Sequence, residues 1–480
     1  MLKNRYASTK LKFLLKYFLI LTLALALSLL YIMEVILIES AFVVAILTVG
    51  FYPLLKVLLN KRIEPLTPKT IIPFTYMLYA LGPLAYKEEF SSSTLSIYLS
   101  LQLLGMVSLN IGLSMRKRNK LNKNSLNESH QRQILKKTSI IFLLVAFVST
   151  LSEIISFGGI GNLINIGYGG DKFLHSTTTF MIGGGFQWLI LSGAIIWYYG
   201  LKTSSVSSKQ LGIIIISISV IVFFLTGGRS TLVYSFIFIS IVYYYQKRNI
   251  NGKLVIFMLI IGIIASQLYS NARYYLPYGF TETVTNTWRI FTNNPMAFMP
   301  LPSNINEFRI PAKSLLEVIE NGNGVEFYGR SYISAIGTPF PFINRLFNYI
   351  GVNPSVWFLD KYHPDILAGG GGLGFSPVTE GYMNFGMLGV VIHMFLYGWT
   401  ISWIFQNYKE KRSVSSLLLY AGALPIFVLD GLRIHLGSAF YKLFRIYLMP
   451  FFIYLLIHLL SKNRSKNNNV TRIDSSSNMH

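Results

Sequence analysis

The sequence predicts an all-α polytopic membrane protein with about 12 transmembrane helices and one large external loop that caps the bundle. Three observations predict this class. Of the 480 residues, 52% are hydrophobic. Only 13% are charged, against about 25% in a typical soluble domain. Apolar runs also recur from one end of the chain to the other, so the prediction does not depend on one segment.

Each predicted span is long enough, or nearly so, to cross about 30 Å of hydrocarbon as a helix. The apolar run after the basic N-terminus is too long for a signal peptide and lacks a cleavage site, which predicts a retained first helix. The segment 226–230 (Thr-Gly-Gly-Arg-Ser) predicts a tight turn between two helices rather than a kink in one. The spans fall at about 17–33, 35–58, 70–86, 95–115, 138–156, 180–200, 211–226, 231–246, 254–271, 380–405, 414–431 and 438–460.

The distribution of basic residues predicts the orientation of the chain. With the N-terminus inside, 29 of the 42 Lys and Arg residues fall on the cytoplasmic side and 11 on the outside, while Lys442 and Arg445 lie in the last span. An odd number of spans would move the basic C-terminal tail outside. We therefore expect both termini in the cytoplasm, with helices 1–9 in residues 1–271, an external loop in 272–379, helices 10–12 in 380–460 and a tail in 461–480.

The kind of cation also differs between the two sides. Arg makes up 9 of the 29 inner cations but 7 of the 11 outer ones. Orientation needs only positive charge, whereas the guanidinium also grips phosphate in a bidentate manner. This bias indicates an anionic ligand outside, although pairing with the acidic residues of the loop would explain about half of these Arg side chains. Such pairing explains Arg229 and Arg433 less well, because both lie in short turns with only Asp430 close in sequence.

The external loop is too rich in aromatic residues to be a disordered linker, and loops this long are usually functional. Ser314 to Glu317 has the pattern of a capping box that opens a short amphipathic helix, which Asn321-Gly322 would end. Gly369–Gly372 and Gly374 precede the tenth span. We interpret these glycines as a hinge or a slack connection rather than a nest for phosphate oxygens.

Several chemistries are disfavoured by what the sequence lacks. The chain has no Cys, which excludes disulfides, thiolate nucleophiles and zinc–thiolate sites. Its seven His residues are scattered, and it has no Asp-x-Asp pair and no Walker loop. We therefore expect no metal and no cofactor. The net charge of +23 follows from cytoplasmic loops, so nucleic acid is not an expected partner.

The strongest local pattern runs from Ser376 to Gly389 and opens a helix at the outer surface. Glu380 falls where the chain enters the membrane, and a carboxylate there is costly unless it is paired or functional. It could act as a general base on a sugar hydroxyl, or it could anchor a cation such as Arg433. Asp430 and His435 are the reserve candidates for the base.

Four features of the chain carry a family resemblance: the segment 226–230, the sequence Asn-Ala-Arg-Tyr at 271–274, the long outer loop and the Ser376–Gly389 block. In these features the chain resembles the oligosaccharide repeat-unit polymerases, which are the Wzy-type or O-antigen polymerase family. The likeness covers roughly 215–440. Members of the family usually carry an Arg-Gly pair before the last span, whereas this chain has Gly431-Leu432-Arg433. The alignment of Arg433 with that pair is therefore open.

The resemblance implies a metal-independent membrane glycosyltransferase that polymerises undecaprenyl-pyrophosphate-linked repeat units into O-antigen (the polymer of lipopolysaccharide) or capsule. Its expected place is the bacterial inner membrane, with the active site facing the periplasm or exterior. The bilayer, a chain-length regulator and a flippase are the further partners. We assign catalytic roles to Glu380, Arg229 and Arg433, and contacts with substrate or pyrophosphate to Arg273, Arg330, Arg289, Tyr274, Tyr332, Tyr382 and His435.

Two other functions fit part of the pattern. An O-antigen ligase would use the same donor with a different acceptor, and only the Ser376–Gly389 block separates it from a polymerase. A transporter or flippase of lipid-linked oligosaccharides would be expected to have short loops and repeated halves. This chain instead has one long outer loop and no visible repeat, which favours the polymerase.

Overall fold

All elements of the described part of the chain are helical in the computed structural model. The structure describes residues 38–59, 64–115, 128–159, 161–162, 183–225, 229–247, 272, 275, 280–293, 306–322, 324–339 and 351–461. Two of the predicted spans, 17–33 and 254–271, lie outside these residues.

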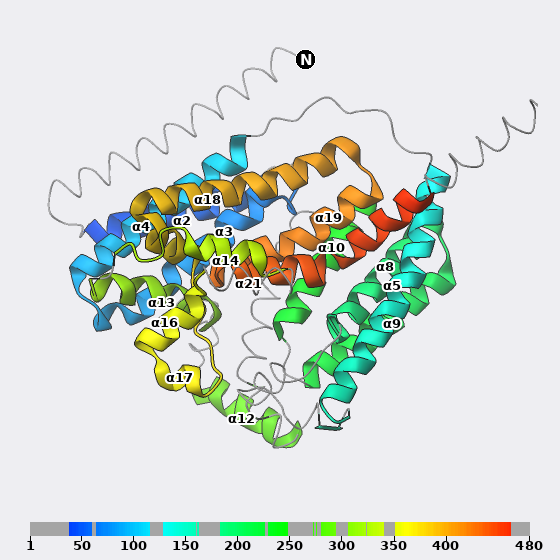
Figure 1. Cartoon of the computed structure of the whole chain (residues 1–480), viewed down its shortest axis with the longest axis horizontal. Coiled ribbons are helices and arrows are strands. Elements are labelled where there is room, and N and C mark those ends of the chain that lie inside the picture. The colour runs from blue at the N-terminus through cyan, green and yellow to red at the C-terminus, as the bar shows by residue number, and fades with distance from the viewer. Residues whose placement is uncertain are drawn as a thin grey trace, which may run out of the picture.

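The helices form two groups that α10 joins (Figure 1). The first group contains α2 (Ile38–Leu59), α3 (Pro68–Leu81), α4 (Ser92–Met115), α18 (Pro377–Lys411) and α19 (Val414–Pro425). The second contains α5 (Glu128–Ser156), α8 (Phe186–Thr203) and α9 (Val206–Leu225). Helix α10 (Arg229–Lys247) packs against α19 on one side and α8 on the other.

The closest packing in the first group is between α4 and α18, and glycine makes it possible. A Cβ atom on Gly112 would collide with the carbonyl oxygen of Phe395, and one on Gly398 would collide with that of Leu109. The hydroxyl of Ser402 also donates a hydrogen bond to the Leu113 carbonyl across 3.0 Å. Small residues that let two backbones touch are typical of helix pairs in membranes, where lipid removes most of the hydrophobic drive for association.

Six helices of the described residues are long and apolar enough to cross a membrane. A bent pair, Leu436–Tyr447 and Met449–Ser461, with a 53° angle between its halves, brings the number to seven if it forms one span. Three more predicted spans overlap the described helices α3, α8 and α10. The number twelve stays a prediction. Helices α9 and α10 lie on either side of the break expected at 226–230 and contact each other. Residues 226–228 lie outside the described residues, so the tight turn stays a prediction.

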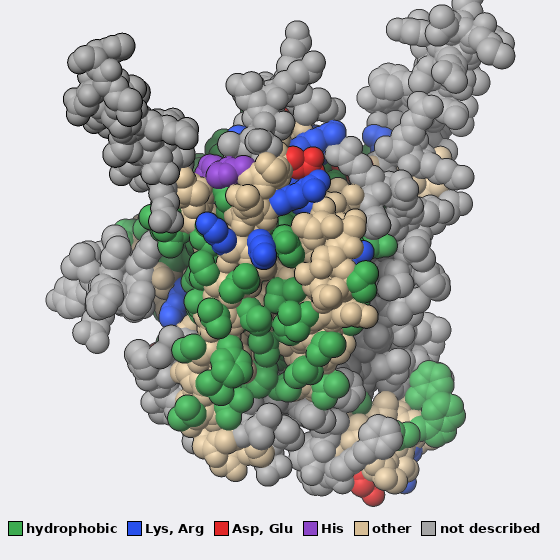
Figure 2. Space-filling model, turned by 90° about the vertical axis from the view of Figure 1, so that its right-hand side faces the viewer, with side chains coloured by type: hydrophobic (Ala, Val, Ile, Leu, Met, Phe, Trp, Pro, Cys, Tyr) green, Lys and Arg blue, Asp and Glu red, His purple; other side chains and the backbone are tan. Residues whose placement is uncertain are grey.

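Segments that the charge pattern puts on the same side contact one another. On the predicted inner side, Lys409 pairs with Glu64, and the hydroxyls of Tyr245 and Tyr420 both donate to the Leu66 carbonyl. On the predicted outer side, the hydroxyl of Ser91 donates to Glu320 across 3.0 Å. Figure 2 shows a broad belt of apolar side chains on the face that carries α5 and α9, with cationic, acidic and His side chains gathered above it.

The described part of the predicted external loop contains five helices: α12 (Phe280–Asn293), α13 (Asn306–Glu320), α14 (Arg330–Gly337), α16 (Pro354–Tyr362) and α17 (Pro364–Ala368). Helix α13 packs against the turn η1 (Gly82–Glu89) and against α3, α4 and α18. A small apolar core joins the loop to the start of α18; it consists of Val318, Phe327, Phe358, Phe375 and Met383.

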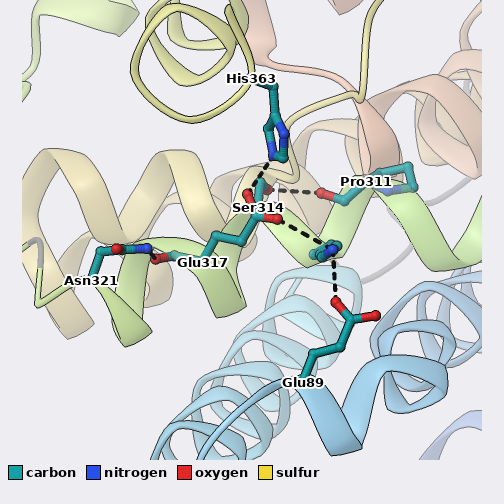
Figure 3. Close-up of polar contacts among 7 residues, drawn as sticks. Glu89, Pro311, Ser314, Glu317, Asn321 and His363 are labelled. Atoms are coloured by element: carbon teal, nitrogen blue, oxygen red, sulfur yellow. Dashed lines mark hydrogen bonds and ion pairs between the residues drawn. The ribbon is translucent and has the colours of Figure 1, made fainter. Parts of the chain in front are cut away.

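The capping box predicted at Ser314–Glu317 is wrong, because α13 already begins at Asn306. The Ser314 hydroxyl donates to the Pro311 carbonyl across 2.8 Å, which is a contact typical of Ser inside a helix. Glu317 accepts a hydrogen bond from His363 (2.8 Å) and pairs with Lys313, which also pairs with Glu89 (Figure 3). The pattern Ser-x-x-Glu therefore links α13 to its neighbours here. The helix end at Asn321-Gly322 is confirmed.

Candidate functional site

A sharp bend inside α18 defines one side of the site. The helix begins where the sequence pattern predicts, and Ser376 caps it by accepting a hydrogen bond from the Thr379 amide (3.1 Å). Phe385 and Gly386 then leave helical geometry, with Gly386 at φ +61°. The bend brings the backbone of Gly389 against that of Gly381, although residues eight apart lie about 12 Å apart along a straight helix.

The carboxylate of Glu380 lies at the centre of a buried hydrogen-bond network. Glu380 is fully buried. Its Oε1 accepts a hydrogen bond from the Ser331 hydroxyl (2.8 Å), and its Oε2 accepts one from the Leu436 amide (2.7 Å). One carboxylate therefore joins the start of α18, helix α14 and the start of α21 (Leu436–Lys442), which follows α20 (Gly431–Arg433).

Asn384 completes this network from the next turn of the same helix. Its Nδ2 donates to the Ser331 hydroxyl and to the Glu380 carbonyl, both across 2.7 Å. Its Oδ1 accepts a hydrogen bond from the Gly329 amide (2.8 Å). Because the bend follows directly at Phe385, the loop before α14 is fastened to the short straight part of α18 that precedes the bend. The network fixes Arg330 and Tyr332, which flank Ser331.

A second cluster lies around Asp430, whose side chain is fully buried in a π-helical segment (Ile426–Asp430). Its Oδ1 accepts hydrogen bonds from the Tyr234 hydroxyl (2.5 Å) and from Nε of Arg433 (2.9 Å). Its Oδ2 lies 3.0 Å from Nζ of Lys442. Two cations therefore contact one buried carboxylate. π-helical turns of this kind are frequent at functional sites.

The two clusters are joined through the backbone at the end of α20. The amide of Phe375 donates to the Arg433 carbonyl across 3.0 Å. Gly374, at φ +77°, packs so tightly against the same carbonyl that a Cβ atom would collide with it. The end of the glycine-rich segment is therefore docked on α20, whereas Gly372 faces open space. Arg433 lies between the Asp430 carboxylate and this docked segment.

The other predicted site residues lie at different places around these clusters. The hydroxyl of Tyr332 forms a hydrogen bond with Nδ1 of His393 (3.1 Å). Burial is the main cause that raises the pKa of Tyr332, and the nearby Glu380 carboxylate raises it further, so the hydroxyl stays protonated. His435 is buried with Nε2 against the Ser438 hydroxyl (2.8 Å). Tyr382 is half-buried, while Arg330 is exposed at the start of α14.

Three predicted residues cannot be placed by their side chains. Arg229 begins α10, little more than one turn before Tyr234, but its side chain lies outside the described residues, as do Arg273 and Tyr274. Arg289 is exposed on α12, which does not pack extensively on any described element of the two clusters. The structure thus brings Glu380, Tyr332, His435 and Arg433 together, with Arg330 next to Ser331 at the start of α14. It leaves Arg289 apart, and the side chains of Arg229 and Arg273 lie outside the described residues.

Sequence reasoning missed four contributors to the site: Lys442, Tyr234, Ser331 and Asn384. A signal existed for Lys442, because a lysine inside a predicted span is a functional candidate by default. No signal existed for Ser331 or Tyr234, whose roles depend on contacts between distant segments. Among the described residues, no three His, Asp or Glu side chains gather where they could hold a metal ion.

These features define the class of the protein as a helical membrane protein with two buried carboxylates, one of which, Asp430, holds two cations. The family model for O-antigen polysaccharide polymerase Wzy matches residues 4–468. The chain therefore belongs to this family of membrane polymerases, which act on lipid-linked oligosaccharide repeat units in polysaccharide biosynthesis. The resemblance noted in the sequence is confirmed. No curated protein and no solved structure matches the chain significantly.

Proposed function

We propose that the chain is a metal-independent glycosyltransferase that joins undecaprenyl-pyrophosphate-linked repeat units on the outer side of the inner membrane. The family assignment supports polymerisation. The observation that supports the rest is the pair of cations held by Asp430, because Arg433 and Lys442 both contact one buried carboxylate and so lie close to each other. An anionic pyrophosphate is the chemical group that such a pair would bind.

The external position of the site is supported by the contacts between loops. The segments near Leu66, Lys409 and Tyr245 meet at one end of the helices, and the basic residues that indicate cytoplasm belong to this end. Arg433 and the start of α18 belong to the opposite end in the same twelve-span arrangement. This arrangement puts both termini in the cytoplasm and the site where the finished repeat units are used.

The proposed reaction is a transfer of a glycosyl group. A hydroxyl oxygen of the acceptor repeat unit attacks the anomeric carbon of the donor sugar, and the bond between that carbon and the pyrophosphate oxygen breaks. The hydroxyl proton leaves to a base, and the pyrophosphate leaves on its lipid. Arg433 and Lys442, joined by Arg229 and Arg273, would stabilise the charge that develops on the leaving group. The side chains of Arg330, Tyr332 and Tyr382 would contact the sugar or phosphate groups of the substrate.

Glu380 has better support as a positioning residue than as the general base first predicted. Both of its oxygens already accept hydrogen bonds, and its side chain is fully buried. A carboxylate in this state has both oxygens engaged and no exposed surface that a sugar hydroxyl could reach. We propose that it holds α14 and the start of α21 in place, and that an oxygen of the leaving pyrophosphate accepts the proton.

The variant Glu380→Gln separates the two roles. Glutamine can still accept a hydrogen bond from Ser331 or the Leu436 amide, so a positioning role predicts that polymer formation falls by less than about tenfold. A general base cannot be replaced by an amide, and its loss costs about 10²- to 10⁴-fold. The measurement is the rate of glycan ladder formation at equal protein level. A loss of more than about 100-fold would restore the base assignment, whereas Glu380→Asp, with its shorter reach, should disturb only positioning.

A strain that lacks the gene tests the function as a whole, by a glycan gel with and without the gene restored. We expect the deletion strain to carry lipid with a single repeat unit and the restored gene to bring back the ladder. Long chains that form but stay on the polyprenyl carrier would indicate a ligase. An absence of repeat units on the outer face would indicate a transporter.

A further inference from the structure

The amphipathic helix α12 (Phe280–Asn293) presents two different exposed surfaces. Val284, Trp288 and Phe291 are 51%, 64% and 41% exposed, and they share one side of the helix at helical spacing. The rings of Trp288 and Phe291 lie 5.6 Å apart. The adjacent exposed side is polar and consists of Thr281, Glu282, Thr285, Arg289 and Thr292.

The third side of the helix faces the protein, because Thr283 is buried and Ile290 is partly buried. The exposed surface of α12 is thus divided lengthwise into an apolar half and a polar half. A helix in contact only with water would not keep Trp and Phe side chains on its exposed surface. A helix at the boundary between hydrocarbon and water needs this division, and Trp and Phe are common at that boundary.

The position of α12 in the fold agrees with such a boundary. Figure 1 shows α12 at the lower edge of the molecule, at the far end from the C-terminal end of α18. That end of α18 carries Lys409, whose partner Glu64 lies on the predicted cytoplasmic side. Helix α12 therefore lies toward the outer ends of the spans. Its length and polar content make it unsuited to cross the membrane, and it is absent from the candidate spans of the described residues.

We propose that α12 lies in the headgroup layer of the outer leaflet, with Val284, Trp288 and Phe291 toward the acyl chains and Thr285 and Arg289 toward water. The partner is the lipid bilayer itself. This location would keep the external loop at the level where lipid-linked substrates present their headgroups. The inference needs the chain to span a membrane, but it does not need the proposed chemistry.

The lack of Cys in the chain makes a direct test possible. Single-cysteine variants of the full-length protein, Val284→Cys, Phe291→Cys, Thr285→Cys and Thr292→Cys, are spin-labelled in liposomes of phosphatidylethanolamine and phosphatidylglycerol. Collisions with oxygen, which concentrates in hydrocarbon, are compared with collisions with a water-soluble nickel chelate. Leu396→Cys on the exposed face of α18 is the control for lipid contact.

We expect labels at 284 and 291 to favour oxygen over the nickel chelate by at least about threefold relative to labels at 285 and 292. An equal ratio of oxygen to nickel-chelate collisions at all four positions would overturn the proposal, because both sides of the helix would then lie in the same environment. Protection of 284 and 291 from both reagents would also overturn it and would indicate a protein partner, such as a second copy. Neither result depends on polymer formation, so this test can fail while the proposed function stands.

Discussion

Arg433→Ala is expected to abolish the polymer while the amount of protein in the membrane holds. The guanidinium donates through Nε to the buried Asp430 carboxylate, and we propose that it carries the pyrophosphate contact. After its removal, Asp430 keeps Lys442 and the Tyr234 hydroxyl as partners, so the fold is retained. The loss of one group that stabilises developing negative charge costs about 10²- to 10³-fold in rate. The rate of ladder formation on a glycan gel, normalised to protein level, measures the effect.

Arg229→Ala is expected to abolish the polymer in the same way, and lysine substitutions at the two positions are expected to have smaller effects. Arg433→Lys should restore activity only in part, because an ammonium group cannot reproduce the planar, bidentate contact of a guanidinium. Arg445→Ala is the matched control. Arg445 lies in the neighbouring π-helical segment, and its guanidinium stacks 4.9 Å from the Tyr441 ring rather than on Asp430. Full activity in both Arg229→Ala and Arg433→Ala would remove the proposed pyrophosphate role.

The sequence could predict the elements of this site because local patterns specify them. Helix α18 begins directly after Ser376, where the sequence pattern predicts a helix, and α9 and α10 lie on either side of the segment 226–230. The positions of the basic residues also predict which loops lie on the same side of the membrane, because basic loops stay in the cytoplasm. In the structure, loops assigned to the same side contact one another. The alternative that Glu380 anchors Arg433 was open in the sequence. In the structure, Arg433 pairs with Asp430, three residues before it.

The partners of Glu380 could not be predicted, because they depend on the bend at Phe385 and Gly386. Helical periodicity continues through these residues, and a glycine inside an apolar helix is common in membranes. Only the fold shows that Ser331 and the Leu436 amide reach the same carboxylate. Lys442 was visible in the sequence as a charged residue inside a span, but its contact with Asp430 joins two segments that a π-helical turn brings into register.

Gly389→Ala tests the bend and should have the largest effect on folding. A Cβ atom at this position would collide with the Gly381 carbonyl oxygen, which is backbone and cannot rotate away. The two segments of α18 would have to separate, which would destabilise the protein by about 3 kcal/mol or more. We expect a clear fall both in the amount of folded protein in membranes and in its thermal stability in detergent.

Gly372→Ala is the matched control, since an added Cβ there would meet nothing within 4 Å. Its effect on stability should stay within about 0.5 kcal/mol. Because the bend carries Glu380 and Asn384 to Ser331, any Gly389→Ala protein that survives should lose polymer formation as well, whereas Gly372→Ala should keep it. Equal stability of the two variants would mean that Gly381 and Gly389 do not touch in the membrane, and the network built on that contact would then need a different origin.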